Sequence, residues 1–172
     1  ERVRMFYQCC LPIIKKYEDY CVNKSYIDFN KLITKCIELL KTDGDVQRKL
    51  HNKYKYILVD EFQDVNKSQV ELIKTMMHPS SQLFCVGDDW QSIYGFRGSD
   101  VNYIVQFSKY FKDSRIISLN KNYRSSQSIV NASNEVIKNN KFKIDKEIKS
   151  ANRSKRKIEV YSATDHNDSI FY

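Results

Sequence analysis

The chain has 172 residues, of which 41% are hydrophobic, so it is long enough for one domain, or for one domain and part of another. No apolar run approaches the roughly 18 residues that cross a bilayer, and the charged residues 1–4 lead into no signal-peptide core, which predicts a soluble, cytoplasmic protein. The five cysteines are odd in number and show no CxxC spacing, which argues against a disulfide framework or a zinc site.

The net charge of +8 is unevenly distributed along the chain. Residues 57–100 carry a net charge of −4, which leaves +12 for the other 128 residues. An acidic centre suits a site for a metal-bound nucleotide, and basic flanks suit the phosphate backbone of a nucleic acid. A lysine-rich solvated surface would give the same totals, so charge alone does not decide between these interpretations.

The N-terminal part of the chain is predicted to be helical. Apolar residues recur at spacings of three and four over residues 2–21, which predicts a first helix. A second helix is expected over residues 25–40, with Asp28 as a possible N-cap. We expect a break at residues 41–45 and a short helix over residues 46–52.

Strands and helices alternate after this helical start. The nearly continuous apolar run at residues 56–60 is typical of a buried parallel strand, and it ends in carboxylates. A helix is expected over residues 67–77. A strand at residues 83–86 then leads into a polar loop with three glycines at residues 87–99.

The same alternation continues in the C-terminal half. We expect a helix over residues 101–111, a strand over residues 115–119 and a helix over residues 125–139, with Ser125 as a possible N-cap. The remaining chain is lysine-rich and weakly patterned until residues 157–163, which alternate like a strand. The pattern as a whole predicts an α/β fold, with a parallel sheet flanked by helices.

Polar clusters follow three of the predicted strands, at the edge where parallel sheets place their chemistry. The first cluster is DEFQD at residues 60–64. An apolar strand that delivers Asp and then Glu can hold Mg²⁺ through the aspartate and activate a water through the glutamate. Strands that end in this dipeptide are common, and many are only solvated turns, so this pattern alone is moderately specific.

The other two clusters are GDDWQSIYGFRGS at residues 87–99 and LNKNYRSS at residues 119–126. DEFQD resembles motif II of the UvrD/Rep-like superfamily 1 DNA helicases, GDDWQSIYGFRGS resembles their motif III, and LNKNYRSS resembles their motif IV. The three motifs occur in the family's order. The resemblance covers about residues 26–137. Trp90 departs from the commonest pattern of the family and, with the preceding GDD, favours its helicase IV branch.

The resemblance implies an ATP site with Mg²⁺. Asp60 would hold the metal ion and Glu61 would be the general base. Gln91 would sense the γ-phosphate, Tyr123 would stack against adenine, and Arg124 would reach the γ-phosphate as an arginine finger. For Tyr123 and Arg124, an ordinary strand-to-helix turn is the alternative interpretation.

The resemblance also implies a surface that binds single-stranded DNA. Tyr94 and Phe96 would stack on bases, and Arg97 would support that contact, because stacking on flat side chains is independent of base sequence. Core packing is the alternative for an aromatic pair at this spacing. The adjacent Arg97 and the two flanking glycines argue against it, since a core strand rarely carries such residues.

The resemblance implies a partial RecA-like P-loop NTPase fold with a helical N-terminal segment. Residues 1–25 would be a helical segment from an inserted subdomain. Residues 26–112 would be the second half of the first motor domain, with motifs II and III. Residues 113–172 would begin the second motor domain, with motif IV.

The four glycines of the chain do not form a GxxxxGK[ST] phosphate-binding loop, so we expect a fragment that is inactive alone. The parent enzyme would be an ATP-dependent DNA helicase of DNA repair. Its partners would be ATP, single-stranded DNA, DNA duplex junctions and the remaining helicase domains of the parent chain.

Two other classes of function remain to be weighed. A carboxylate-metal nuclease could use four acidic residues, namely Asp60, Glu61, Asp64 and Asp88. Nuclease sites usually place a lysine beside their acids, whereas Lys67 lies on the following predicted helix. A helicase-like module that only docks nucleic acid or protein would not need intact residues for ATP chemistry. The chain keeps Asp60, Glu61, Gln91 and Arg124.

Overall fold

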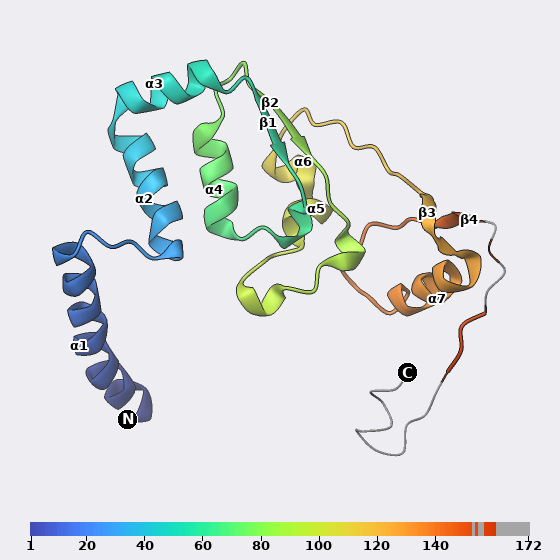
Figure 1. Ribbon diagram of the computed structural model, residues 1–172, viewed down its shortest axis with the longest axis horizontal. Coiled ribbons are helices and arrows are strands. Elements are labelled where there is room, and N and C mark those ends of the chain that lie inside the picture. Colours follow the sequence, from blue (N-terminus) through green and yellow to red (C-terminus); the bar gives the residue numbers. More distant parts are fainter. Residues whose placement is uncertain (153, 155–156, 161–172) are drawn as a thin grey trace. The chain divides into compact units, whose positions relative to one another are not determined.

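The computed structural model describes residues 1–152, 154 and 157–160, and the chain divides into two compact units (Figure 1). Each unit contains one parallel pair of strands among the described residues, together with helices. The predicted α/β class, with parallel strands and flanking helices as in a partial RecA-like fold, is therefore confirmed. Within the part of the chain that the structure describes, no helix is both long and apolar enough to cross a membrane.

The first unit comprises residues 1–87 and 94–100. Its helical start consists of α1 (Arg2–Asn23), α2 (Phe29–Thr42) and α3 (Gly44–Lys53). The expected N-cap of the second helix is confirmed, because the Asp28 carboxylate accepts a hydrogen bond of 2.7 Å from the backbone N–H of Lys31. The helix begins four residues later than the predicted start at residue 25.

The predicted break at residues 41–45 is wrong in its extent. Only Asp43 interrupts the helices, and Gly44 is already the first residue of α3. The reason is a second N-cap: the Asp43 carboxylate accepts hydrogen bonds from the backbone N–H groups of Asp45 and Val46. A cap of this kind satisfies the free amide groups of the first turn and lets a new helix begin at once.

A βαβ arrangement forms the remainder of the first unit. Strand β1 (Tyr56–Val59) pairs in parallel with β2 (Gln82–Cys85), and α4 (Lys67–Met76) connects them. Helix α4 starts with a capping box between Asn66 and Gln69, and it packs against α2. The buried apolar side chains of this unit come from the helices and from the turn after β1: Cys21, Ile37, Leu40, Phe62, Val65, Val70 and Ile73.

The prediction of a buried strand at residues 56–60 is wrong for one face of β1. Ile57 and Val59 are partly buried, whereas Tyr56 and Leu58 are 68% and 73% exposed. A continuous apolar strand is buried on both faces only where helices cover both faces of its sheet. The described residues cover only the face of β1 that carries Ile57 and Val59.

The second unit comprises residues 88–93 and the chain from residue 101 onward. Its elements are the 3₁₀ turn η2 (Asp89–Gln91), the short helices α5 (Asn102–Val105) and α6 (Phe107–Tyr110), strand β3 (Lys121–Ser126), helix α7 (Gln127–Ile137) and strand β4 (Lys149–Asn152). Strands β3 and β4 pair in parallel, and α7 packs against both.

The predicted helix over residues 101–111 is wrong in one respect, because it is broken at Gln106 into α5 and α6. Aromatic and β-branched residues dominate the segment, and their helix propensity is below average. Ring contacts hold the two turns together instead: the ring centroids lie 4.7 Å apart in the pair Tyr103–Tyr110 and 4.8 Å apart in the pair Phe107–Phe111.

The predicted strand over residues 115–119 is also wrong. That segment is irregular, and the strand is β3, which contains the NYRSS sequence itself. The reason is pairing: β3 meets β4 from Lys121↔Lys149 onward, whereas residues 115–119 have no partner strand among the described residues. An apolar run without a neighbouring strand cannot satisfy its backbone groups as a sheet.

Two smaller expectations also fail at the ends of this unit. Ser125 lies within β3, and the N-cap of α7 is Ser126, whose side chain makes no capping hydrogen bond. Residues 157–160 of the predicted last strand are not in a strand, and residues 161–163 lie outside the described residues. Strand β4 was missed because its sequence, KSAN, has no strand-like alternation of apolar residues.

Candidate functional site

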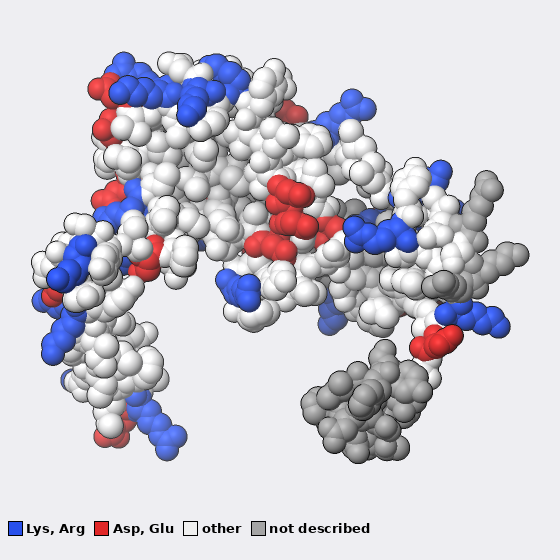
Figure 2. Space-filling model, viewed as in Figure 1, with Lys and Arg blue, Asp and Glu red and all other residues white. Residues whose placement is uncertain are grey.

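Asp60 and Glu61 follow β1 directly and are exposed, and acidic side chains gather over this end of the strand (Figure 2). Glu61 has a left-handed backbone conformation, with φ 51° and ψ 42°, before the 3₁₀ turn η1 (Phe62–Asp64). This conformation is uncommon for a residue other than glycine, and surrounding structure must maintain it. One contact is local: the backbone N–H of Glu61 donates to Oδ1 of Asp60 over 2.9 Å.

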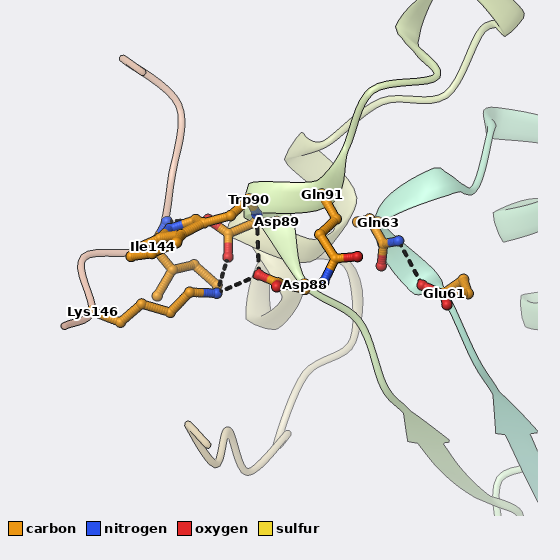
Figure 3. A network of polar contacts seen from close by, with 8 residues as sticks. All are labelled: Glu61, Gln63, Asp88, Asp89, Trp90, Gln91, Ile144 and Lys146. Carbon is orange, nitrogen blue, oxygen red and sulfur yellow. Dashed lines mark hydrogen bonds and ion pairs between the residues drawn. The ribbon is translucent and has the colours of Figure 1, made fainter. Parts of the chain in front are cut away.

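Two buried neighbours hold the conformation of Glu61. Phe62 is fully buried, and its N–H donates to the carbonyl oxygen of Val86, the residue after β2, over 2.9 Å. Gln63 is 2% exposed, and its Nε2 donates to Oε2 of Glu61 over 2.8 Å and to Oδ2 of Asp64 over 3.2 Å (Figure 3). The carboxylate of Glu61 is therefore held in place by a buried amide.

The donor set at this strand end fits a nucleotide-bound magnesium ion. Mg²⁺ is usually held through one or two carboxylates together with phosphate oxygens. Oδ1 of Asp60 accepts the Glu61 N–H, which leaves Oδ2 for a ligand, and Oδ1 of Asp64 is buried without a hydrogen-bond partner. Within the described residues, no group of three or more His, Cys, Asp or Glu side chains could hold a metal ion.

The loop at residues 94–100 presents two aromatic rings and a cation. The Tyr94 and Phe96 ring centroids lie 6.1 Å apart, and the Arg97 guanidinium carbon lies 5.1 Å from the first and 5.4 Å from the second. Phe96 is 79% exposed, so the rings are not part of the core. The 3₁₀ turn η3 (Gly95–Arg97) ends at Gly98, whose φ of 85° favours glycine.

Backbone contacts join this loop to the turn that follows Glu61, within the first unit. The N–H of Asp100 donates to the carbonyl oxygen of Val65 over 3.1 Å. Asn66 and Ser99 form an antiparallel bridge. The aromatic loop, residues 94–100, is thus anchored through Ser99 and Asp100 to Val65 and Asn66, which directly follow the turn at residues 60–64.

Asp89, in the second unit, is a buried carboxylate with two donors. It is 4% exposed. The backbone N–H of Ile144 donates to its Oδ2 over 2.6 Å, and Nζ of Lys146 donates to its Oδ1 over 2.7 Å (Figure 3). A buried carboxylate requires such partners, because removing its charge from water is costly.

Asp88 shares the same lysine and also contacts Gln91. Nζ of Lys146 lies 2.8 Å from Oδ1 of Asp88, and Nε2 of Gln91 donates to Oδ2 over 2.8 Å. Burial opposes ionisation of Asp88, but hydrogen bonds from Lys146 and Gln91 outweigh it and lower the pKa of the carboxyl group. Burial likewise opposes the charge of Lys146, yet the two aspartates raise its pKa. Both partners are therefore charged at neutral pH.

The NYRSS sequence in β3 forms an ordered turn with exposed side chains. Oδ1 of Asn122 accepts the backbone N–H groups of Arg124 and Ser125 over 2.9 and 2.8 Å. Nδ2 of Asn152 donates to the carbonyl oxygen of Arg124 over 3.0 Å. The side chains of Tyr123 and Arg124 are exposed, so both are accessible to a ligand.

The structure brings the expected site residues together in four local groups. These groups are Asp60 with Glu61, Tyr94 with Phe96 and Arg97, Gln91 with Asp88, and Tyr123 with Arg124. Within the described part of the second unit, no hydrogen bond links Gln91 to Tyr123 or Arg124.

Sequence reasoning missed two participants, Lys146 and the backbone N–H of Ile144. Both lie in the weakly patterned lysine-rich segment, where nothing distinguishes one lysine from the next. The doublet Asp88-Asp89 was the only signal, because adjacent carboxylates in a folded turn require a cation or several donors.

Comparison with known proteins gives two family matches. Residues 4–112 match the UvrD/REP helicase N-terminal domain, and residues 117–172 match the UvrD-like helicase C-terminal domain. The first match alone covers more than half of the chain.

Individual relatives agree with these matches. The chain is 38% identical over 161 residues to the ATP-dependent DNA helicase PcrA of Staphylococcus aureus, which covers 94% of this chain and 22% of that protein. It is 37% identical over 165 residues to the protein of the same name from Staphylococcus epidermidis, covering 96% of this chain and 23% of that protein. The chain thus spans less than a quarter of the length of these relatives.

Proposed function

The chain belongs to the UvrD/REP helicase family, and from this membership we propose that it forms part of an ATP-dependent DNA helicase that couples ATP hydrolysis to movement on single-stranded DNA. The relatives that carry this activity in their names are more than four times longer than the match. The activity is therefore proposed for the full-length protein. The chain alone, without a GxxxxGK[ST] loop, is expected to be inactive as an ATPase.

The observation that carries the proposal is the conformation of Glu61. Glu61 has a left-handed backbone conformation, which carries a conformational cost. The buried Gln63 and the fully buried Phe62 maintain this conformation. Such strain is concentrated at functional sites, and here it fixes a carboxylate at the carboxyl edge of a parallel sheet. This position suits a general base that orients and deprotonates the attacking water.

The remaining nucleotide contacts follow from the motifs. Asp60 would hold Mg²⁺, which neutralises phosphate charge when it is bound. Gln91 would contact the γ-phosphate, Tyr123 would stack on adenine, and Arg124 would stabilise charge that develops on the phosphate. The exposure of Tyr123 and Arg124 supports these roles, because a ligand can reach both side chains.

Contact with DNA would use the aromatic loop. Tyr94 and Phe96 are exposed beside Arg97, an arrangement that suits sequence-independent stacking and backbone neutralisation. We assign residues 26–112 to the first motor domain, residues 113–172 to the start of the second, and residues 1–25 to an inserted subdomain. A cytoplasmic helicase of DNA repair that acts at single strands and duplex junctions, in the helicase IV branch, fits these features.

The test is the substitution Glu61→Gln in the full-length protein. The amide keeps the size and the hydrogen-bonding capacity of the side chain but cannot accept the proton of the water, so ATP binding should persist while hydrolysis falls at least about 100-fold. The partly exposed Glu71 on α4, which pairs with Lys41, provides a matched control, since Glu71→Gln should leave turnover unchanged. Near-normal ATP turnover in Glu61→Gln would remove the general base from the proposal.

A further inference from the structure

We propose that Lys146 is a positioning residue for Gln91, because it neutralises Asp88 and Asp89 and so fixes the carboxylate that orients the Gln91 amide. This proposal rests on the proposed function, in which Gln91 contacts the γ-phosphate. All four residues belong to the second compact unit. Lys146 lies outside the three sequence motifs.

The first step of the argument is that Lys146 is built into the turn. Its side chain is 14% exposed, and its ammonium group lies 2.8 Å from Oδ1 of Asp88 and 2.7 Å from Oδ1 of Asp89 (Figure 3). The ammonium group also lies 5.0 Å from the centre of the Trp90 ring, within the range of a cation–π contact. These three contacts and the low exposure distinguish Lys146 from a solvated surface lysine.

The second step concerns charge. Asp88 and Asp89 are adjacent in sequence, and their carboxylates would repel each other in this half-buried turn without a cation between them. Lys146 is the cation that bridges them among the described residues. Removal of Lys146 would leave the Asp89 carboxylate, which is 4% exposed, with the Ile144 N–H as its remaining donor among the described residues, which favours rearrangement of the turn.

The third step connects the lysine to Gln91. The two oxygens of Asp88 have different partners: Oδ1 faces Lys146 over 2.8 Å and also accepts the backbone N–H of Trp90 over 3.2 Å, and Oδ2 accepts the Gln91 amide over 2.8 Å. The lysine, together with the Trp90 N–H, thereby fixes the plane of the carboxylate that Gln91 uses. With one amide hydrogen held in this way, Gln91 keeps one N–H and its carbonyl oxygen for a ligand, in a defined direction.

The test is a double-mutant cycle in the full-length protein, with steady-state ATPase kinetics on saturating single-stranded DNA. Lys146→Met should lower kcat about tenfold, as expected for loss of a charge-assisted hydrogen bond that acts on the reacting group, with little change in KM for ATP. In a Gln91→Ala background, the same substitution should have almost no further effect, because the side chain that it positions is absent.

Lys149→Met is the matched control. Lys149 lies three residues further along, its side chain is 71% exposed, and its ion-pair partner among the described residues is Glu147, at 3.7 Å. Its substitution should leave kcat unchanged in both backgrounds.

Equal fold losses of kcat from Lys146→Met in the wild-type and Gln91→Ala backgrounds would overturn the proposal, since a merely structural role predicts independent effects. If Lys146→Met does not fold, the same cycle with Lys146→Gln, which keeps a donor but lacks the charge, decides the question in the same way. Lys146→Arg should recover most of kcat. Failure of the proposed function is distinguishable, because it would show as ATP turnover that survives Glu61→Gln, whatever the cycle gives.

Discussion

Substitution of Phe96 by Ala should weaken binding of single-stranded DNA while leaving the fold intact. Stacking of one base on an aromatic side chain is worth about 1 to 3 kcal/mol, so the dissociation constant should rise about 5- to 150-fold. Phe96 is 79% exposed, so the substitution removes little buried apolar area. At about 25 cal/mol per Å², the loss in free energy of folding is roughly 1 kcal/mol or less. The loss of affinity should therefore not result from unfolding.

The assay is fluorescence anisotropy with a labelled oligothymidine and the full-length protein, at two salt concentrations. Phe96→Trp should retain the affinity, because it keeps a flat ring over which a base can stack. Phe29→Ala is the matched control, since Phe29 is 91% exposed at the start of α2 and far from the aromatic loop in sequence. It should bind DNA as the wild type does.

The result that refutes the reasoning is specific. If Phe96→Ala binds single-stranded DNA with unchanged affinity, and circular dichroism shows an intact fold, no base stacks on this ring. The exposed pair of Tyr94 and Phe96 would then need another explanation, such as contact with a different part of the full-length protein. A loss of affinity that Phe29→Ala shares would equally remove stacking as the cause.

Two further predictions concern coupling and thiol chemistry. In the full-length protein, Gln91→Ala should reduce stopped-flow unwinding more than ATP hydrolysis, and equal proportional losses of the two activities would contradict a coupling role. Arg124→Ala should depress hydrolysis itself by roughly 10³- to 10⁵-fold, as for other arginine fingers. Burial raises the pKa of Cys85 to about 12, so near pH 9 its thiol should stay protonated and react with a disulfide reagent far more slowly than the exposed Cys9; since the unfolded thiol ionises first, folding stability should fall as pH rises above about 9. Equal labelling rates of the two thiols in the native protein would contradict this.

The sequence predicts the first unit better than the second, for a physical reason. Strands β1 and β2, helix α4 and the cap at Asp28 are encoded locally, by apolar runs, a capping residue and turn chemistry. Strand β3 is defined instead by its pairing with β4, whose KSAN sequence carries no strand pattern. A strand that depends on a distant partner cannot be placed from its own residues, which is why the prediction fell on residues 115–119.

The candidate site shows the same division. Asp60, Glu61 and the aromatic loop were predictable from motifs, because each occupies a fixed place after a strand. The left-handed conformation of Glu61 was not, since it depends on burial of Phe62 and Gln63. Lys146 could not be found either, because it contacts Asp89 across 57 residues of sequence and no local pattern marks it.

The division of the GDDWQSIYGFRGS sequence between the two units bears on how ATP state could reach DNA. Residues 88–93 belong to the second unit and residues 94–100 to the first. The amide of Gln91 is held by Asp88, whereas the aromatic loop is held by the turn after Glu61, through Val65 and Asp100. Ser92 and Ile93 join these two anchored parts along the chain. Because Gln91 lies only three residues before Tyr94, we expect a shift of Gln91 on loss of the γ-phosphate to shift the stacking aromatic residues as well, so that ATP state would reach DNA through this short connection.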